Sequence, residues 1–309
     1  MSVTIYHHPS SHTHQMPDGH PECIARVEAV EQALRSLPSL TWETCPEATR
    51  AQLEAGHDPA YLDGLIKAQP TSGLVALDAD TTLSPGTLTA ASHAVGGACA
   101  AVDAVLSGQT QSAFVAMRPP GHHAERDKPM GFCLYSTIAL AAKHAASAHG
   151  LTRIAIVDFD VHHGNGTQDV LWDDENVRFV SSHQMPLWPG SGAAHEVGAH
   201  GQITNIPFAP HTGSAQFRKT YERDVLPMLD AYAPELILIS AGFDAHTDDP
   251  LANLDLQTSD FAWITDRLVE LAATHSKGRI VSTLEGGYDL HALAQSTAAH
   301  VRSLLEAAP

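Results

Sequence analysis

The chain has 309 residues, of which 43% are hydrophobic and 17% are charged, and this composition excludes a disordered chain. Its 35 acidic residues outnumber 17 basic ones, and the formal net charge of −18 argues against a nucleic-acid partner, which requires a basic surface. The same charge would attract a cationic substrate, although a requirement for solubility explains it equally well.

Short apolar runs rich in β-branched residues alternate with longer segments of helical pattern. In chain order they predict a strand at Val3–Tyr6, helices at Glu22–Leu37 and Pro85–Leu106, a strand at Ala113–Met117, a helix at Ser136–Ala148, strands at Arg153–Asp158 and Val177–Ser181, a helix at Ser214–Ala231, a strand at Leu236–Ser240, a helix at Ser259–Thr274, a strand at Arg279–Thr283 and a helix at Leu290–Leu305. Ser214 and Ser259 are the expected N-caps of their helices.

This alternation predicts an α/β fold with a central, mostly parallel sheet, since runs that are apolar throughout are typical of strands buried on both faces. Asp78–Pro85 and His183–Gly201 have the composition of loops, and no linker or repeat divides the chain. We therefore expect a single domain spanning residues 1–309.

Cysteine usage and the N-terminal sequence indicate the compartment. The four cysteines form no C-x-x-C pair, which favours a reducing environment. The first residues do not resemble a signal peptide, and no apolar run approaches the ~18 residues that span a membrane. We expect a cytoplasmic protein with no membrane partner, and the sequence leaves homo-oligomers open.

Polar groups follow four of the predicted strands at their carboxyl ends, where open parallel sheets place their chemistry. These segments are Arg118–His123, Asp158–Gly166, Ser240–His246 and Leu284–Tyr288. The sequence therefore predicts an active site at this edge of the sheet.

Three metal-binding side chains alternate after one of these strands. Asp158, Asp160 and His162 have period two, which places them on one side of an extended backbone. Two of them can bind a metal, and Asp244 from another strand end supplies the third ligand of a catalytic zinc site. Iron and manganese also suit two carboxylates and an imidazole, and acids held by hydrogen bonds without a metal are the alternative.

Five motifs together resemble the histone deacetylase family, in particular its class II-like and bacterial members, such as acetoin-utilisation proteins and acetylpolyamine amidohydrolases. They are Arg118-Pro-Pro-Gly-His-His-Ala, Gly131-Phe-Cys, Asp158-Phe-Asp-Val-His-His-Gly-Asn-Gly-Thr-Gln, Ser240-Ala-Gly-Phe-Asp and Glu285-Gly-Gly-Tyr. The similarity extends from about His20 to Leu305. It implies an arginase/deacetylase-like three-layer fold, one catalytic zinc on Asp160, His162 and Asp244, and hydrolysis of an acyl amide.

The resemblance also assigns catalytic roles. His123 would be the general base and then the acid, oriented by Asn165, while His122 would lie beside Asp158 and act through its charge. Tyr288 would donate a hydrogen bond to the developing oxyanion.

Further positions follow from the same resemblance. A potassium ion would be held by Asp158, Asp160, His162, Ser181 and Ser182. The substrate-binding residues would be Phe132 and Trp188 as the tunnel walls, with Gly131, Gly286 and Leu251 around them. Polyamine-selective relatives carry an acid at the position of Leu251, so leucine weakens a polyamine reading.

The expected substrate is an acylated lysine or a small acylated amine, with acetylpolyamine as the alternative. A binuclear manganese ureohydrolase would need a second Asp-x-Asp pair, which Asp244-Ala-His-Thr-Asp248 does not supply. A non-catalytic protein that binds acylated amines is a further alternative, and the presence of His123 and Tyr288 argues against it.

Overall fold

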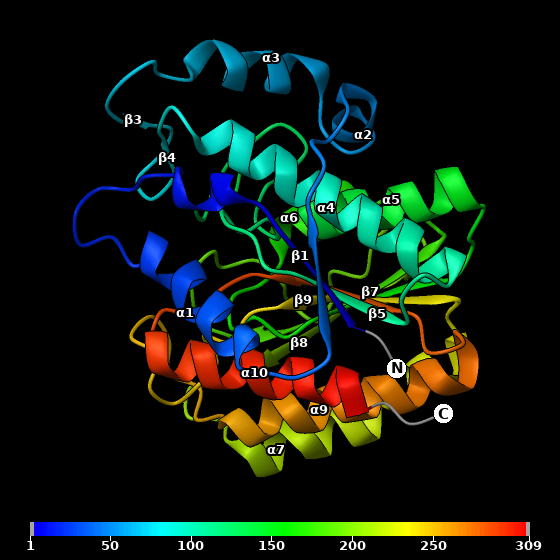
Figure 1. The fold of residues 1–309 in the computed structure, drawn as a ribbon. Helices are drawn as coiled ribbons and strands as arrows, with labels where there is room; N and C mark the ends of the chain where they lie inside the picture. The colour runs from blue at the N-terminus through cyan, green and yellow to red at the C-terminus, as the bar shows by residue number, and fades with distance from the viewer. Residues whose placement is uncertain (1–2, 307–309) are drawn as a thin grey trace.

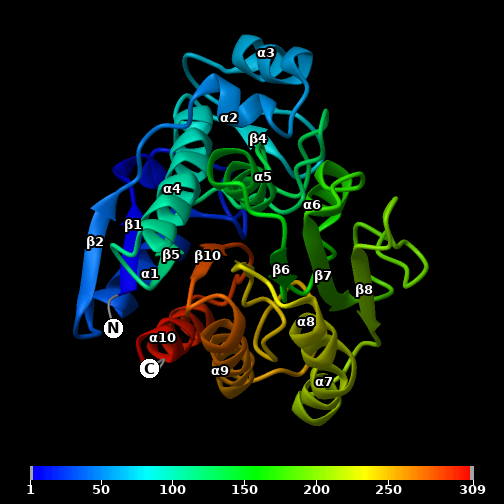
Figure 2. The same ribbon diagram turned by 90° about the vertical axis from the view of Figure 1, so that its right-hand side faces the viewer.

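The computed structural model describes residues 3–306 and is built on an eight-stranded sheet in which all neighbouring strands are parallel (Figures 1 and 2). Its order is β2-β1-β5-β10-β9-β6-β7-β8. The strands are β1 Val3–His7, β2 Leu40–Thr44, β5 Ser112–Val115, β6 Ile154–Asp158, β7 Val177–Gln184, β8 Ile203–Phe208, β9 Leu236–Ala241 and β10 Ile280–Leu284. The predicted α/β fold is confirmed, and the sheet is parallel throughout.

Helices cover both faces of the sheet and complete three layers (Figure 1). One face carries α1 Ile24–Arg35, α7 Ser214–Thr220, α8 Leu226–Tyr232, α9 Thr258–His275 and α10 Leu290–Glu306. The other carries α4 Thr87–Ser107, α5 Thr137–His149 and α6 Asn165–Val170, with α2 Arg50–Glu54 and α3 Pro59–Ala68 outside them.

The central strands are apolar on both faces because each face packs against helices. In β5, Phe114 belongs to the core beneath α9 and α10, whereas Ala113 and Val115 belong to the core beneath α4 and α5. This arrangement accounts for the uninterrupted apolar runs in the sequence, because a strand with one wet face would alternate instead.

Several boundaries differ from the sequence prediction. The helix expected at Ser214–Ala231 is divided into α7 and α8 by a π-helical turn at Tyr221–Val225. The N-caps are Gly213 and Gln257, one and two residues before the serines that were expected to cap. The segment expected to be a loop at Asp78–Pro85 contains β4 Thr82–Leu83, which pairs with β3 Val75–Ala76, and the loop expected from His183 begins inside β7. A 3-10 helix follows β1 at Pro9–His12.

Helix α4 corrects the expectation that no segment approaches membrane-spanning length. Within residues 3–306 it is the one helix long and apolar enough, but 78% of its apolar window is buried inside the protein. Because many of its residues are alanine and glycine, this helix does not stand out in the sequence as a long apolar run. A helix buried in a protein core can have the length and apolar composition of a membrane span.

The four strand ends that carry polar motifs are adjacent in the sheet. Strands β5, β10, β9 and β6 are consecutive neighbours, so their carboxyl ends lie side by side at one edge. The prediction that these segments meet is confirmed.

Candidate active site

Asp160, His162 and Asp244 converge just beyond the carboxyl ends of neighbouring strands β6 and β9. Nδ1 of His162 lies 3.3 Å from Oδ1 of Asp160 and 3.1 Å from Oδ2 of Asp244. One donor atom from each residue lies within 4.8 Å of the other two. Three side chains from two strand ends thus present their donor atoms to a common point.

These residues fit a divalent cation. Both carboxylates are almost fully buried, and burial together with the nearby Asp160 charge raises the pKa of Asp244. Two buried carboxylates facing one imidazole carry negative charge that costs several kcal/mol to desolvate, and a metal ion offsets this. Two oxygens and one nitrogen suit zinc and leave a coordination position for water or substrate.

Two glycines allow the carboxylates to approach the backbone. A Cβ on Gly242 would overlap the Asp160 carboxylate, and one on Gly286 would overlap the carboxylate of Asp244. The N–H of Gly286 instead donates to Oδ2 of Asp160 at 2.8 Å. The first glycine of the Glu285-Gly-Gly-Tyr motif therefore leaves room for the Asp244 carboxylate and donates a hydrogen bond to that of Asp160.

The tandem histidines have different partners. Nδ1 of His122 lies 3.0 Å from Oδ2 of Asp158, while Nδ1 of His123 lies 2.7 Å from Oδ1 of Asn165. The amide nitrogen of Asn165 donates to Oε1 of Glu125 at 2.8 Å, so its oxygen faces His123 and accepts the Nδ1 proton. Nε2 of His123 then carries the lone pair that a base requires.

The surroundings also separate the pKa values of the two imidazoles. Burial lowers the pKa of His122, but the carboxylates of Asp160 and Asp158 outweigh it and hold that pKa well above 6.5. Burial and the neighbouring His122 and His162 hold the pKa of His123 well below 6.5. The two imidazoles, whose ring centroids lie 3.9 Å apart, therefore differ in proton affinity, and His122 holds a proton more tightly than His123 does.

Two acidic residues to which the sequence assigned no role hold the turn before the histidines. Oε2 of Glu285 accepts the N–H groups of Gly121 at 2.7 Å and His122 at 3.1 Å. Arg118 is buried, and its Nε donates to Oε1 of Glu22 at 2.7 Å. The motif letters marked Arg118 and Glu285, but only the fold shows these contacts.

Arg26 supports the loop that carries Tyr288. Its Nε donates to the carbonyl of Gly287 at 2.6 Å, and its guanidinium lies 4.7 Å from the centroid of the Tyr288 ring. Arg26 is fully buried in α1, and a charge on the apolar face of a predicted helix was the signal available in the sequence. Burial raises the pKa of Tyr288 well above 10, so its hydroxyl keeps its proton.

A narrow cavity of about 40 Å³ leads to these groups. It is lined by Asp80, His123, Gly131, Phe132, His162, Trp188, Leu251 and Tyr288. The structure thus brings all the predicted substrate-binding residues except Gly286 to one pocket, and Gly286 lies behind it against the carboxylates. Typical ligand sites enclose at least about 300 Å³, so this one suits a thin chain.

Asp80 is the pocket residue that sequence reasoning did not identify. Its loop is shaped by Asp78, whose Oδ1 accepts the N–H groups of Asp80 at 2.8 Å and Thr81 at 2.5 Å. Oγ1 of Thr81 accepts the N–H of Phe132 at 3.2 Å, which ties this loop to the pocket wall. A hydrogen-bonded turn thus holds a carboxylate at the rim.

The residues predicted to hold potassium include two members of the triad, Asp160 and His162, together with Asp158, Ser181 and Ser182 on the neighbouring strands β6 and β7. Asp158 pairs with Ser181 in the register of β6 and β7, and Oγ of Ser182 lies 3.5 Å from the carbonyl oxygen of Asp158. The structure brings these residues together, and the potassium site stays a prediction.

Comparison with known proteins agrees with this geometry. Residues 20–304 match the family model of the histone deacetylase domain. The chain belongs to the histone deacetylase family. It is 38% identical to histone deacetylase 14, chloroplastic, of Arabidopsis thaliana, across 93% of this chain and 73% of that protein. It is 36% identical to a histone deacetylase-like amidohydrolase of Pseudomonas aeruginosa, across 87% and 71% of the two chains.

Two further histone deacetylase relatives extend the comparison. The polyamine deacetylase HDAC10 of Mus musculus is 35% identical across 98% of this chain and 48% of its own. The crystal structure of the HDA15 HD domain matches with a TM-score of 0.93 and 30% identity, covering 99% of this chain and 89% of that one. The protein is therefore a deacetylase or amidohydrolase of this family, for which an acetylated substrate and a metal site are implied.

Proposed function

We propose that the protein is a zinc-dependent deacylase that removes an acetyl or similar acyl group from the amine of a lysine side chain or a small molecule. The observation that carries this proposal is the meeting of His123, Tyr288 and His162 in one narrow pocket, with the buried carboxylates of Asp160 and Asp244 beside them. The proposed zinc ligands are Asp160, His162 and Asp244.

Zinc, when bound, lowers the pKa of water toward about 7 and withdraws electron density from a carbonyl. His123 accepts a proton from the attacking water at Nε2 and later donates a proton to the leaving amine nitrogen. The Asn165 hydrogen bond keeps the His123 ring in the tautomer that this first step needs. The reaction consumes one water and releases a carboxylic acid and an amine.

The other polar groups stabilise charge or hold the substrate. His122, beside Asp158, places positive charge close to the reacting atoms. The hydroxyl of Tyr288 donates to the carbonyl oxygen as negative charge develops, and such a donor is worth ~10²–10³ in rate. Phe132 and Trp188 flank the aliphatic chain of the substrate, and Asp80 accepts an N–H of the substrate at the rim.

The remaining proposals concern ions and location. Potassium on the main chain of Asp158, Asp160 and His162, with Ser181 and Ser182, would offset the charge of the buried carboxylates. All four cysteines are free thiols, which supports action in a reducing compartment such as the cytoplasm. We also propose one catalytic domain spanning the chain.

An acetylpolyamine is the second candidate substrate. The similarity to a relative named as a polyamine deacetylase and the carboxylate of Asp80 at the rim support it. Leu251, which supplies no charge to a distant amine, weighs against it.

A turnover panel tests the proposal on the zinc-loaded enzyme. Acetyl-lysine peptides, free acetyl-lysine, acetylpolyamines and longer-acyl lysines are compared as substrates. Tyr288→Phe is the test variant, and Tyr232→Phe is the matched control because the Tyr232 hydroxyl donates to a distant carbonyl, that of Asn176. We expect turnover of at least one class, loss of ~10²–10³ in kcat for Tyr288→Phe with zinc retained, and wild-type rates for Tyr232→Phe. Full activity of Tyr288→Phe would refute the oxyanion role, and no turnover of any substrate would favour a binding protein.

A further inference from the structure

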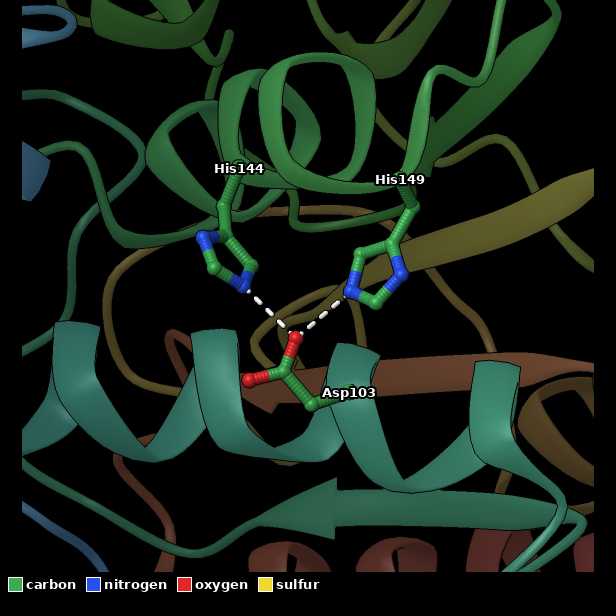
Figure 3. A group of neighbouring side chains, drawn as sticks. All are labelled: Asp103, His144 and His149. Carbon is green, nitrogen blue, oxygen red and sulfur yellow. Dashed lines mark hydrogen bonds and ion pairs between the residues drawn. The ribbon is translucent and has the colours of Figure 1, made fainter.

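Three side chains outside the pocket converge on one point of the surface (Figure 3). Asp103 lies on α4, and His144 and His149 lie on α5. Nε2 of His144 is 2.7 Å, and Nε2 of His149 is 2.6 Å, from the same oxygen, Oδ1 of Asp103. Both rings thus present a nitrogen to one carboxylate oxygen.

Helix periodicity alone does not produce this convergence. Residues five apart on a helix lie about 140° apart around its axis, whereas neighbours on one face are three or four apart. His144 and His149 nevertheless both turn toward α4, with ring centroids 5.8 Å apart and planes at 80°. The two imidazoles approach the carboxylate from different directions, as ligands of a tetrahedral ion do.

The local charge favours a cation. Asp103 lies in the last turn and a half of α4, and His149 is the final residue of α5. Helix C-termini carry partial negative charge, which disfavours a carboxylate and favours a cation. Across residues 3–306, the ion pairs of Asp103 are with these two histidines, and the neighbouring Lys143 pairs with Asp174 instead.

We infer that Asp103, His144 and His149 form a second metal site, which binds Zn²⁺ and joins the C-terminal ends of α4 and α5. Two imidazole nitrogens and one carboxylate oxygen are zinc ligands, and water completes the coordination. Each ring would carry its proton on Nδ1 and offer Nε2 to the metal. Tetrahedral zinc separates its ligand atoms by about 3.3 Å, a little more than half an ångström wider than the present contacts.

The side chains have the freedom and the access that binding requires. The exposed fractions of the side chains are 53% for Asp103, 15% for His144 and 31% for His149, so rotation can widen the contacts and an ion can enter. Among the described residues, just two groups bring three such donors together, this one and the catalytic triad. The single pair of His275 with Asp230, at 2.7 Å, offers only two donors and serves as a matched control.

Metal counting on the full-length enzyme tests the inference. The probe is zinc alone, buffered at micromolar free concentration, with bound metal measured by elemental analysis after equilibrium dialysis. We expect two zinc ions per chain in the wild type and in His275→Gln, and one in His144→Gln and in His149→Gln. Each of these two variants should bind the second zinc at least about tenfold more weakly and keep wild-type turnover and circular dichroism.

Two readouts distinguish a metal site from a hydrogen-bonded cluster. Zinc should shift the side-chain nitrogen resonances of His144 and His149 and leave those of His275 unchanged. It should also raise the Tm of the wild type above that of His149→Gln, because an ion that binds only the folded state stabilises it. One zinc per chain in the wild type, or a second zinc that survives both histidine variants, would overturn the inference.

Discussion

The carboxylate of Asp249 accepts a hydrogen bond from the backbone N–H of Tyr288, with 2.7 Å between Oδ2 and N. Its other oxygen accepts the N–H of Leu251 at 3.0 Å. One buried side chain therefore fixes both the loop that carries the tyrosine and the rim residue at the pocket mouth.

Replacing Asp249 by Asn should misplace Tyr288. An amide of the same shape has one acceptor oxygen, so either Tyr288 or Leu251 loses its partner. We expect kcat to fall by about tenfold to a hundredfold, with KM and zinc content little changed. Asp248→Asn, at the exposed neighbouring position, is the control and should keep wild-type kinetics. An unchanged kcat in Asp249→Asn would show that this hydrogen bond does not position the tyrosine.

A methyl group at Gly286 should weaken metal binding. It would overlap the Asp244 carboxylate and force it away from Asp160 and His162. We expect at least about tenfold weaker zinc binding in Gly286→Ala, measured by competition with a chelator, and a parallel loss of turnover. Gly64→Ala, on an exposed position of α3 with open space around it, should bind zinc normally. Equal zinc affinity in the two variants would contradict the role assigned to Gly286.

A carboxylate at position 251 should move selectivity toward polyamines. Leu251 lines the pocket, and a charge there would attract the distant ammonium of an acetylpolyamine. In a solvated rim the attraction is worth roughly 1 kcal/mol, or about fivefold in kcat/KM relative to acetyl-lysine.

Leu251→Gln is the matched control, because it has the size of Glu without the charge. The gain of Leu251→Glu over Leu251→Gln should shrink as salt is added. If both variants change selectivity alike, size rather than charge is responsible.

His300 should make the folded state sensitive to acid. It is fully buried, with Nδ1 at 2.7 Å from Oγ1 of Thr265 and Nε2 at 2.9 Å from Oγ of Ser282, and burial lowers its pKa to about 3. Because the unfolded chain binds this proton near pH 6.5 and the folded chain does not, the free energy of unfolding falls as the pH drops below about 6.5.

Denaturant titrations between pH 7 and pH 5 measure this contribution. At about 1.4 kcal/mol per pH unit below the unfolded pKa, His300 should account for about 2 kcal/mol of the stability lost. His300→Gln should reduce the loss by that amount. A loss identical in wild type and His300→Gln would show that His300 is protonated in the folded state.

The strand-end motifs could be located from the sequence because the strands before them are buried on both faces. Strands β5, β6, β9 and β10 are covered on both faces, so they are apolar runs that end abruptly in polar residues. The edge strands β2 and β8 do not have this pattern of an apolar run followed by polar residues. Leu40–Thr44 is largely exposed, and Ile203–Phe208 includes Asn205 and Pro207, so neither resembles a buried strand.

The supporting contacts of the site were less accessible to sequence reasoning. Asp249 and Glu285 accept hydrogen bonds from backbone N–H groups. Almost every residue type has a backbone N–H, so a sequence motif does not show which residue is the partner. Asp80 reaches the pocket through a turn whose position depends on the tertiary fold. Chemistry carried by a side chain at a strand end is visible in a sequence, whereas chemistry that depends on which loop folds over which strand is not.

The common direction of the eight strands gives the molecule two unlike ends. The catalytic side chains lie at the carboxyl ends of the strands, so the opposite end, where α5 ends at Gly150 before β6, is remote from the pocket. A fluorophore, affinity tag or fused domain attached at this end would leave the pocket mouth open to substrates. The enzyme could thus be anchored to a solid support through that end while its substrates approach from the other.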